Sequence, residues 1–293
     1  MAQHSHPPRR VAQSPKQNTF FGGAAVLAAG ILVVKLIGLF YKIPLLNIIG
    51  EQGTADFGNA YNIYAVLLTI STAGLPVAVS KLVSEANALG RQNQVRRTFR
   101  LAMALFLTLG VLSFLVMFFC ADQLAGLMHD SMAAPGIKAL APAVICVGCL
   151  SAFRGYAQGH GRMTPTAVSQ IIEALGKLII GLALAWFLVQ QGMSSAFSAA
   201  WAIFGVTCGA GICLIYLIAD HVRRRRSETG RLDDAPEDHG VILKKLMVIA
   251  VPITLCASVT PITSWLDTAQ VQNILRDIMG AQPAEWYEAQ SVV

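Results

Sequence analysis

The chain has 293 residues, of which 55% are hydrophobic and 13% are charged, and its formal net charge is +6. Its mean hydropathy is +0.57. Soluble domains carry about 25% charged residues, and a soluble globule this apolar would expose large sticky patches. The composition therefore excludes an ordinary water-soluble domain and favours a protein embedded in lipid.

Apolar segments that are nearly free of charge recur at the length of a membrane-crossing helix, about 20 residues. Lipid cannot satisfy backbone polar groups, so spanning segments are helices or closed barrels. These runs are too continuous for the alternating pattern of barrel strands, so we predict an all-α, polytopic membrane helix bundle. The seven predicted spans cover residues 20–43, 57–79, 99–120, 136–153, 165–189, 196–219 and 246–266.

Residues 1–18 are polar and are predicted to form a disordered cytoplasmic tail rather than a cleavable signal peptide. The first span then holds Lys35 and, two turns later, Lys42, on one face of the helix. An ionisable group near the centre of the bilayer costs about 2.5–3.5 kcal/mol, so such groups tend to mark a hydrated cavity. We expect Lys35 to face such a cavity. Lys42 either joins it or extends to the membrane interface.

Asp56 stands at the predicted external start of the second span, and Asp267 ends the seventh. Each carboxylate either contributes to the cavity or serves as an ordinary helix-end residue; at a helix start it is favoured by the helix dipole. The polar segment 81–97 is predicted to be a helical connector at the cytoplasmic surface. The six cysteines, including Cys146 and Cys149, are interpreted as packing residues, because free cysteine is often buried and no second pair accompanies them.

Glu173 and Lys177 occupy the fifth span at positions i and i+4, in the favourable order for an ion pair on a helix. Two interpretations remain open. The pair either fixes helix packing, or it faces a central cavity in which one charge is exchanged for a substrate or an ion.

The basic residues are distributed unevenly. With the N-terminus placed in the cytoplasm, 17 of the 22 Lys and Arg residues fall in predicted cytoplasmic segments and two fall outside. This asymmetry is the positive-inside pattern of membrane proteins. It assigns the Arg223–Arg226 run to topology and to contact with anionic membrane lipids, and nucleic acid is not an expected partner.

The predicted organisation is a six-helix lobe over residues 19–220, a basic cytoplasmic linker over 221–245, and a seventh span with an external tail over 246–293. Among known catalytic signatures, the sequence contains no P-loop, HExxH, GxSxG or Rossmann fingerprint. We therefore predict no enzyme activity, no metal and no cofactor, with H⁺ or Na⁺ as the possible coupling ion of a transporter.

Three stretches resemble the polysaccharide and lipid-linked oligosaccharide exporters, in particular the branch typified by stage V sporulation protein B. They are KLIGLFYKIPLLNIIG at 35–50, AYNIY with STAGLPVAVSKLVSE at 60–85, and FRGYAQGHGRMTPTAVSQIIEA at 153–174. The family includes lipid II flippases. The resemblance implies alternating access between two helical lobes, driven by an ion gradient or the membrane potential, and a lipid-linked pyrophosphate sugar as substrate.

The resemblance gives the in-span charges a role. Lys35, Lys42 and Lys177 would meet an anionic headgroup as point charges, and Asp56 corresponds by position to an important acidic residue of lipid II flippases. Tyr41 stands where those proteins carry an arginine. Such flippases have about fourteen helices, so we expect this chain to be a fragment, or a half that pairs with a second lobe or a second copy.

Two alternatives come from other classes. A multidrug or cation antiporter of the related multidrug-extrusion family would favour an acidic cavity, whereas the spans hold three Lys and one Glu. A non-transporting membrane scaffold or an intramembrane transferase would lack a central hydrated cavity or would show an Asp-rich metal site.

Overall fold

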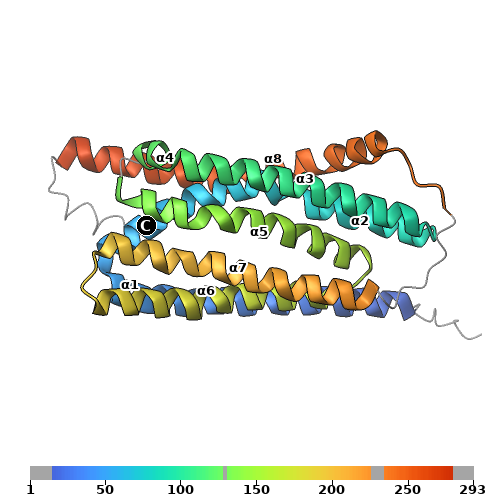
Figure 1. Cartoon of the computed structure of the whole chain (residues 1–293), viewed down its shortest axis with the longest axis horizontal. Coiled ribbons are helices and arrows are strands. Elements are labelled where there is room, and N and C mark those ends of the chain that lie inside the picture. The colour runs from blue at the N-terminus through green and yellow to red at the C-terminus, as the bar shows by residue number, and fades with distance from the viewer. Residues whose placement is uncertain (1–14, 128–130, 226–233, 280–293) are drawn as a thin grey trace, which may run out of the picture.

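A computed structural model of the chain describes residues 15–127, 131–225 and 234–279. Long helices lie side by side along one axis (Figure 1). Six apolar segments are long enough to cross a membrane, which confirms the predicted all-α polytopic bundle. The elements are α1 (Pro15–Thr72), α2 (Leu75–Ala88), α3 (Gln92–Phe119), α4 (Ala121–Leu127), the 3-10 helix η1 (Ser131–Ala133), α5 (Ala134–Gly159), α6 (Thr164–Gln190), α7 (Ser195–Arg225) and α8 (His239–Met279).

Helix α1 contains the first two predicted spans, because the chain reverses at Gly50. Gly50 has φ 72°, a conformation that glycine adopts without steric cost. The rings of Tyr41 and Phe57 lie 5.8 Å apart, whereas 16 residues of straight helix would separate them by about 24 Å. We call residues 15–49 α1a and residues 51–72 α1b. Counted this way, the bundle has seven crossing helices, in agreement with the seven predicted spans.

The second predicted span is interrupted before its end. Helix α1b stops at Thr72, and α2 restarts at Leu75 with Pro76 in its first turn, where proline is tolerated. At the break, the Gly74 N–H donates a hydrogen bond of 3.0 Å to Thr254 Oγ1 of α8. A Cβ on Gly74 would overlap the carbonyl oxygen of Ala250. The break therefore brings the backbones of α1b and α8 into direct contact.

Helices α6 and α7 pack through facing glycines. A Cβ on Gly205 would lie 2.5 Å from Gly181 Cα, and a Cβ on Gly209 would lie 2.7 Å from the Glu173 carbonyl oxygen. Small residues allow this close backbone approach in membrane bundles. Gly205 and Gly209 thus determine how closely α6 can approach α7.

Several boundaries differ from the prediction. Helix α1 begins at Pro15, within the predicted tail, and α4 and η1 occupy the predicted external connection between the third and fourth spans. Helix α7 extends to Arg225 and α8 begins at His239, so both enter the predicted linker. The tail up to residue 14, Arg226, Arg231 and the external tail from residue 280 lie outside the described residues.

The described part of the linker is hydrogen-bonded to the start of α3. The two carboxylate oxygens of Asp234 accept hydrogen bonds from the backbone N–H groups of Asn93 at 2.8 Å and Gln94 at 2.9 Å. Arg97 donates to the Glu237 carbonyl oxygen at 2.8 Å. Desolvation raises the pKa of the Asp234 carboxyl, but the two N–H donors outweigh it and hold the pKa below its usual value. Asp234 therefore caps α3 from about 140 residues away in sequence.

Candidate functional site

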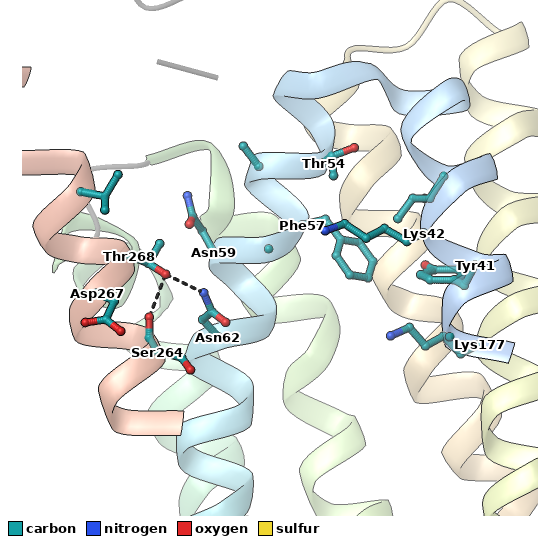
Figure 2. Close-up of a pocket in the computed structure, with 15 residues that line it drawn as sticks. Tyr41, Lys42, Thr54, Phe57, Asn59, Asn62, Lys177, Ser264, Asp267 and Thr268 are labelled. Atoms are coloured by element: carbon teal, nitrogen blue, oxygen red, sulfur yellow. Dashed lines mark hydrogen bonds between the residues drawn. The ribbon is translucent and has the colours of Figure 1, made fainter. Parts of the chain in front are cut away.

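A cavity of about 530 Å³ opens between α1a, α1b, α6 and α8 (Figure 2). This volume lies within the usual range of small-molecule sites. On one side it is lined by Tyr41, Lys42 and Lys177, which we call the basic wall. On the other side it is lined by Asn59, Asn62, Ser264, Asp267 and Thr268, which we call the polar wall. The remaining lining residues are Gly38, Leu45, Thr54, Ala55, Phe57, Gly58 and Val271.

The Lys177 amine lies among aromatic faces. Its Nζ is 4.5 Å from the ring centroid of Tyr61, 4.8 Å from that of Tyr41 and 5.5 Å from that of Phe57. Each such contact attracts a cation by about 0.5–2 kcal/mol. The rings therefore compensate part of the cost of holding an ammonium group inside the bundle, and the amine still borders the cavity.

Lys42 approaches the same cavity from α1a. Its side chain is exposed, and Figure 2 shows the amines of Lys42 and Lys177 both pointing toward α1b. Lys35 is also exposed, but it is not a lining residue. Because seven residues separate it from Lys42, it lies about 10 Å further along the same face of α1a. The structure thus brings Lys42 and Lys177 together at the cavity and leaves Lys35 beyond its edge.

Glu173 has a different partner from the one its spacing suggests. Its carboxylate accepts from Arg154 Nη2 of α5 at 2.7 Å, and Arg154 Nε donates to Ser169 at 2.9 Å. Arg154 also contacts Cys213 of α7 at 3.5 Å. The expected mutual pairing of Glu173 with Lys177 is therefore replaced by an interhelical pair.

Arg154 directly follows the fourth predicted span, 136–153, and so belongs to the predicted cytoplasmic segments. It lies instead inside α5, with its side chain 13% exposed. Only its position at the very end of a predicted span hinted at this role.

Asp56 is buried, at 2% exposure, on α1b. Its neighbours Ala55 and Phe57 line the cavity, whereas Asp56 does not. Asp267 of α8 does line it, so the carboxylate that lines the cavity is one that the sequence also allowed as a helix-end residue.

The polar wall joins α1b to α8. Asn62 Nδ2 donates to Thr268 Oγ1 at 3.2 Å, and Thr268 donates to the Ser264 carbonyl oxygen at 2.8 Å (Figure 2). Sequence reasoning missed Asn59, Asn62, Ser264 and Thr268 because it followed charges alone. Their signal was that amide and hydroxyl side chains are also unfavourable in lipid.

Among the described residues, no group of three or more His, Cys, Asp or Glu side chains is placed to hold a metal ion. The charged residues that line the cavity are Lys42, Lys177 and Asp267, and they can bind a ligand through charge and hydrogen bonds.

This arrangement defines a class: a polytopic membrane bundle with a charged cavity between its helices. Residues 20–278 match the model of a family described as polysaccharide biosynthesis protein. The chain belongs to this family, as the resemblance predicted.

Curated relatives agree with this assignment. The chain is 29% identical over 264 residues to the lipid II flippase MurJ of Bacillus subtilis (strain 168), covering 84% of this chain and 48% of that protein. It is 30% identical over 205 residues to stage V sporulation protein B of the same organism, covering 69% of this chain and 39% of that protein. The chain thus spans about half the length, or less, of these relatives.

Solved structures share the fold. An outward-facing multidrug resistance MATE family transporter of the MOP superfamily aligns with a TM-score of 0.68 at 16% identity, over 82% of this chain and 52% of that one. A MOP superfamily transporter from Pyrococcus furiosus, described as having a binding pocket of reverse polarity, aligns with a TM-score of 0.65 at 14% identity, over 87% of this chain and 55% of that one. At these identities the likeness concerns the fold.

Proposed function

We propose that this helical bundle serves a transporter that moves a lipid-linked, pyrophosphate-bearing sugar precursor across the cytoplasmic membrane by alternating access. The observation that carries the proposal is the basic wall, where Lys42 and Lys177 border one cavity inside a membrane bundle. Family membership and the lipid II flippase among its relatives support the class of substrate.

The charges around the cavity favour an anionic cargo over a cationic one. Glu173, the acidic residue that would attract a cation, is paired with Arg154. Lys177 is held by ring faces, which attract a cation less strongly than a carboxylate would, so its charge remains available to a ligand. An antiporter for cationic drugs would have to tolerate two lysines against the single carboxylate of Asp267.

Alternating access needs a second set of helices opposite the cavity. We propose that these are further helices of a longer polypeptide or a second copy of this chain, and that the N-terminus is cytoplasmic. The transport activity itself requires no enzyme chemistry from this chain, and the coupling ion would be H⁺ or Na⁺.

The test is transport of a fluorescent lipid-linked diphosphate sugar in proteoliposomes. Transport is measured by quenching the fluorescence of the lipid molecules that are in the outer leaflet. Removing a charged hydrogen-bond partner costs about 1.5–3 kcal/mol, which corresponds to roughly a tenfold to hundredfold loss. We expect Lys177→Ala and Lys42→Ala to lower the initial rate by at least about tenfold. Lys35→Ala should have a smaller effect, because Lys35 lies beyond the cavity edge.

Lys138→Ala is the matched control. The Lys138 amine lies 3.2 Å from the Asp122 carboxylate, and neither residue lines the cavity. Loss of the Lys138 amine should therefore leave the transport rate unchanged. Equal rates for the wild type, Lys42→Ala and Lys177→Ala, or a wild-type rate no higher than that of protein-free vesicles, would contradict the proposal.

A further inference from the structure

The cavity is divided by charge. Both lysines stand on the basic wall, formed by α1a and α6, while the polar wall of α1b and α8 carries two amides, hydroxyls and one carboxylate. Figure 2 shows the two groups on opposite sides. We infer that the polar wall is a binding subsite for the uncharged sugar of the ligand, and that the basic wall takes the diphosphate. This inference rests on the proposed function and adds the orientation of the ligand.

The side chains of the polar wall suit a sugar. Sugar hydroxyls both donate and accept hydrogen bonds, and the half-buried Asn62 offers a side-chain amide that can do the same. The Asp267 carboxylate is an acceptor only, and it is exposed toward solvent and the cavity. Hydrogen bonds to a charged acceptor are the stronger kind, so Asp267 is the main expected contact to sugar hydroxyls.

The same carboxylate excludes the opposite orientation. A diphosphate placed against the polar wall would bring its negative charges close to Asp267, and like charges repel one another more strongly where water is partly excluded. A diphosphate against the basic wall meets two amines instead. The ligand therefore binds in one orientation, with its diphosphate at the basic wall and its sugar at the polar wall.

Hydrogen bonds within the polar wall hold two of its side chains in place. The Asn62 amide is held by Thr268, which is in turn bonded to the Ser264 carbonyl oxygen. A preorganised site loses less conformational entropy on binding. Because the wall is shared between α1b and α8, a bound sugar would contact both helices at once.

Binding of two probes to the full chain in nanodiscs tests the inference by calorimetry. One probe is a short-chain polyprenyl diphosphate, and the other is the same lipid carrying one N-acetylglucosamine. We expect Asp267→Asn to weaken the sugar-bearing probe about tenfold and to change the affinity for the sugar-free probe less than twofold. Lys177→Ala should weaken both probes by the same factor.

Asp122→Asn is the matched control, since Asp122 is an exposed carboxylate outside the cavity. Asn62→Leu provides a second variant. It should repeat the selective loss, and the sugar-free probe reports whether that variant is folded.

Five results would overturn the inference. Asp267→Asn could weaken both probes equally, leave both unchanged, or tighten the sugar-free probe, which would place the phosphate at the polar wall. The sugar could also add no affinity in the wild type while Lys177→Ala still weakens diphosphate binding; that result overturns the subsite alone. A wild-type chain that binds neither probe contradicts the proposed function as well.

Discussion

At the residue scale, the bundle holds two internal cations by different means. Arg154 donates hydrogen bonds to the Glu173 carboxylate, the Ser169 hydroxyl and the Cys213 thiol. These partners stabilise the guanidinium, because a buried charge left without partners is costly. The Lys177 amine instead lies over aromatic rings and borders the cavity. The arrangement around Arg154 is typical of a residue that stabilises helix packing. The arrangement around Lys177 leaves a positive charge that a ligand can neutralise.

Asp234 offers a prediction outside the membrane. Because its pKa is depressed in the folded chain, the stabilisation it provides is complete above the ordinary carboxyl pKa of about 4 and is lost as the pH falls through the lower folded-state value. Asp234→Ala should therefore lower stability by about 1 kcal/mol at pH 7, the usual value of a helix cap. At pH 3 the difference from the wild type should shrink. Thermal unfolding midpoints at both pH values measure it.

Asp122→Ala serves as the comparison for Asp234. The Asp122 side chain is 72% exposed and makes a surface ion pair with Lys138, and such pairs contribute little. A pH-independent loss in Asp234→Ala would show that the carboxylate does not act through its hydrogen bonds to α3.

At the element scale, the α6–α7 contact depends on which face of α7 a glycine occupies. Gly205 and Gly209 face α6, where an added Cβ would meet backbone at 2.5 Å and 2.7 Å, whereas nothing lies within 4 Å of a Cβ on Gly211. Gly205→Ala and Gly209→Ala should each destabilise the bundle by about 1–3 kcal/mol through overpacking. Gly211→Ala should be neutral or stabilising by up to about 1 kcal/mol, since alanine favours helix.

The measurement is the unfolding midpoint of the three alanine variants in detergent. Gly211→Ala is the internal control, because all three changes add one methyl group to the same helix. If Gly211→Ala were as destabilising as Gly209→Ala, helix propensity or lipid contacts rather than the α6–α7 approach would govern the effect.

The helices themselves were predictable, whereas some of their contacts were not. Long apolar runs separated by basic turns indicate spans directly, and the Gly50 reversal joins two such runs as the sequence suggested. The Glu173–Arg154 pair joins α5 to α6. The i, i+4 spacing relates residues of one helix only, so it predicted Lys177 as the partner of Glu173 and could not indicate Arg154 on α5.

At the scale of the whole molecule, the cavity was predictable in kind but not in outline. In-span lysines indicated a hydrated site, and Lys42 and Lys177 do meet there. The helical face shared by Lys35 and Lys42 extends beyond the cavity, and periodicity does not say where a neighbouring helix stops covering it. The polar wall depends on α8 meeting α1b some 200 residues away in sequence, which no local pattern encodes.

The two ends of the bundle differ in charge, and this difference predicts orientation. Glycines with positive φ mark four described turns, at Gly50, Gly90, Gly161 and Gly192. The α2–α3 and α5–α6 turns lie at one end of the bundle, and the reversal within α1 and the α6–α7 turn lie at the other (Figure 1). Arg91, Arg96, Arg97 and Arg100 follow the Gly90 turn, and Arg162 follows Gly161. The turns at Gly50 and Gly192 have no adjacent Lys or Arg. The Gly90 end should therefore be cytoplasmic.

Thiol labelling in cells tests this orientation. The six native cysteines are first replaced by serine or alanine, and a single cysteine is then introduced at an exposed turn position, Gln191→Cys or Leu89→Cys. A membrane-impermeant maleimide should label Gln191→Cys in intact cells and Leu89→Cys only after permeabilisation, when both should react to the same extent. The reverse pattern would invert the bundle and place the Lys42 end of the cavity in the cytoplasm. Labelling of both positions in intact cells would mean that the chain inserts in two orientations, and the charge asymmetry would then not determine its topology.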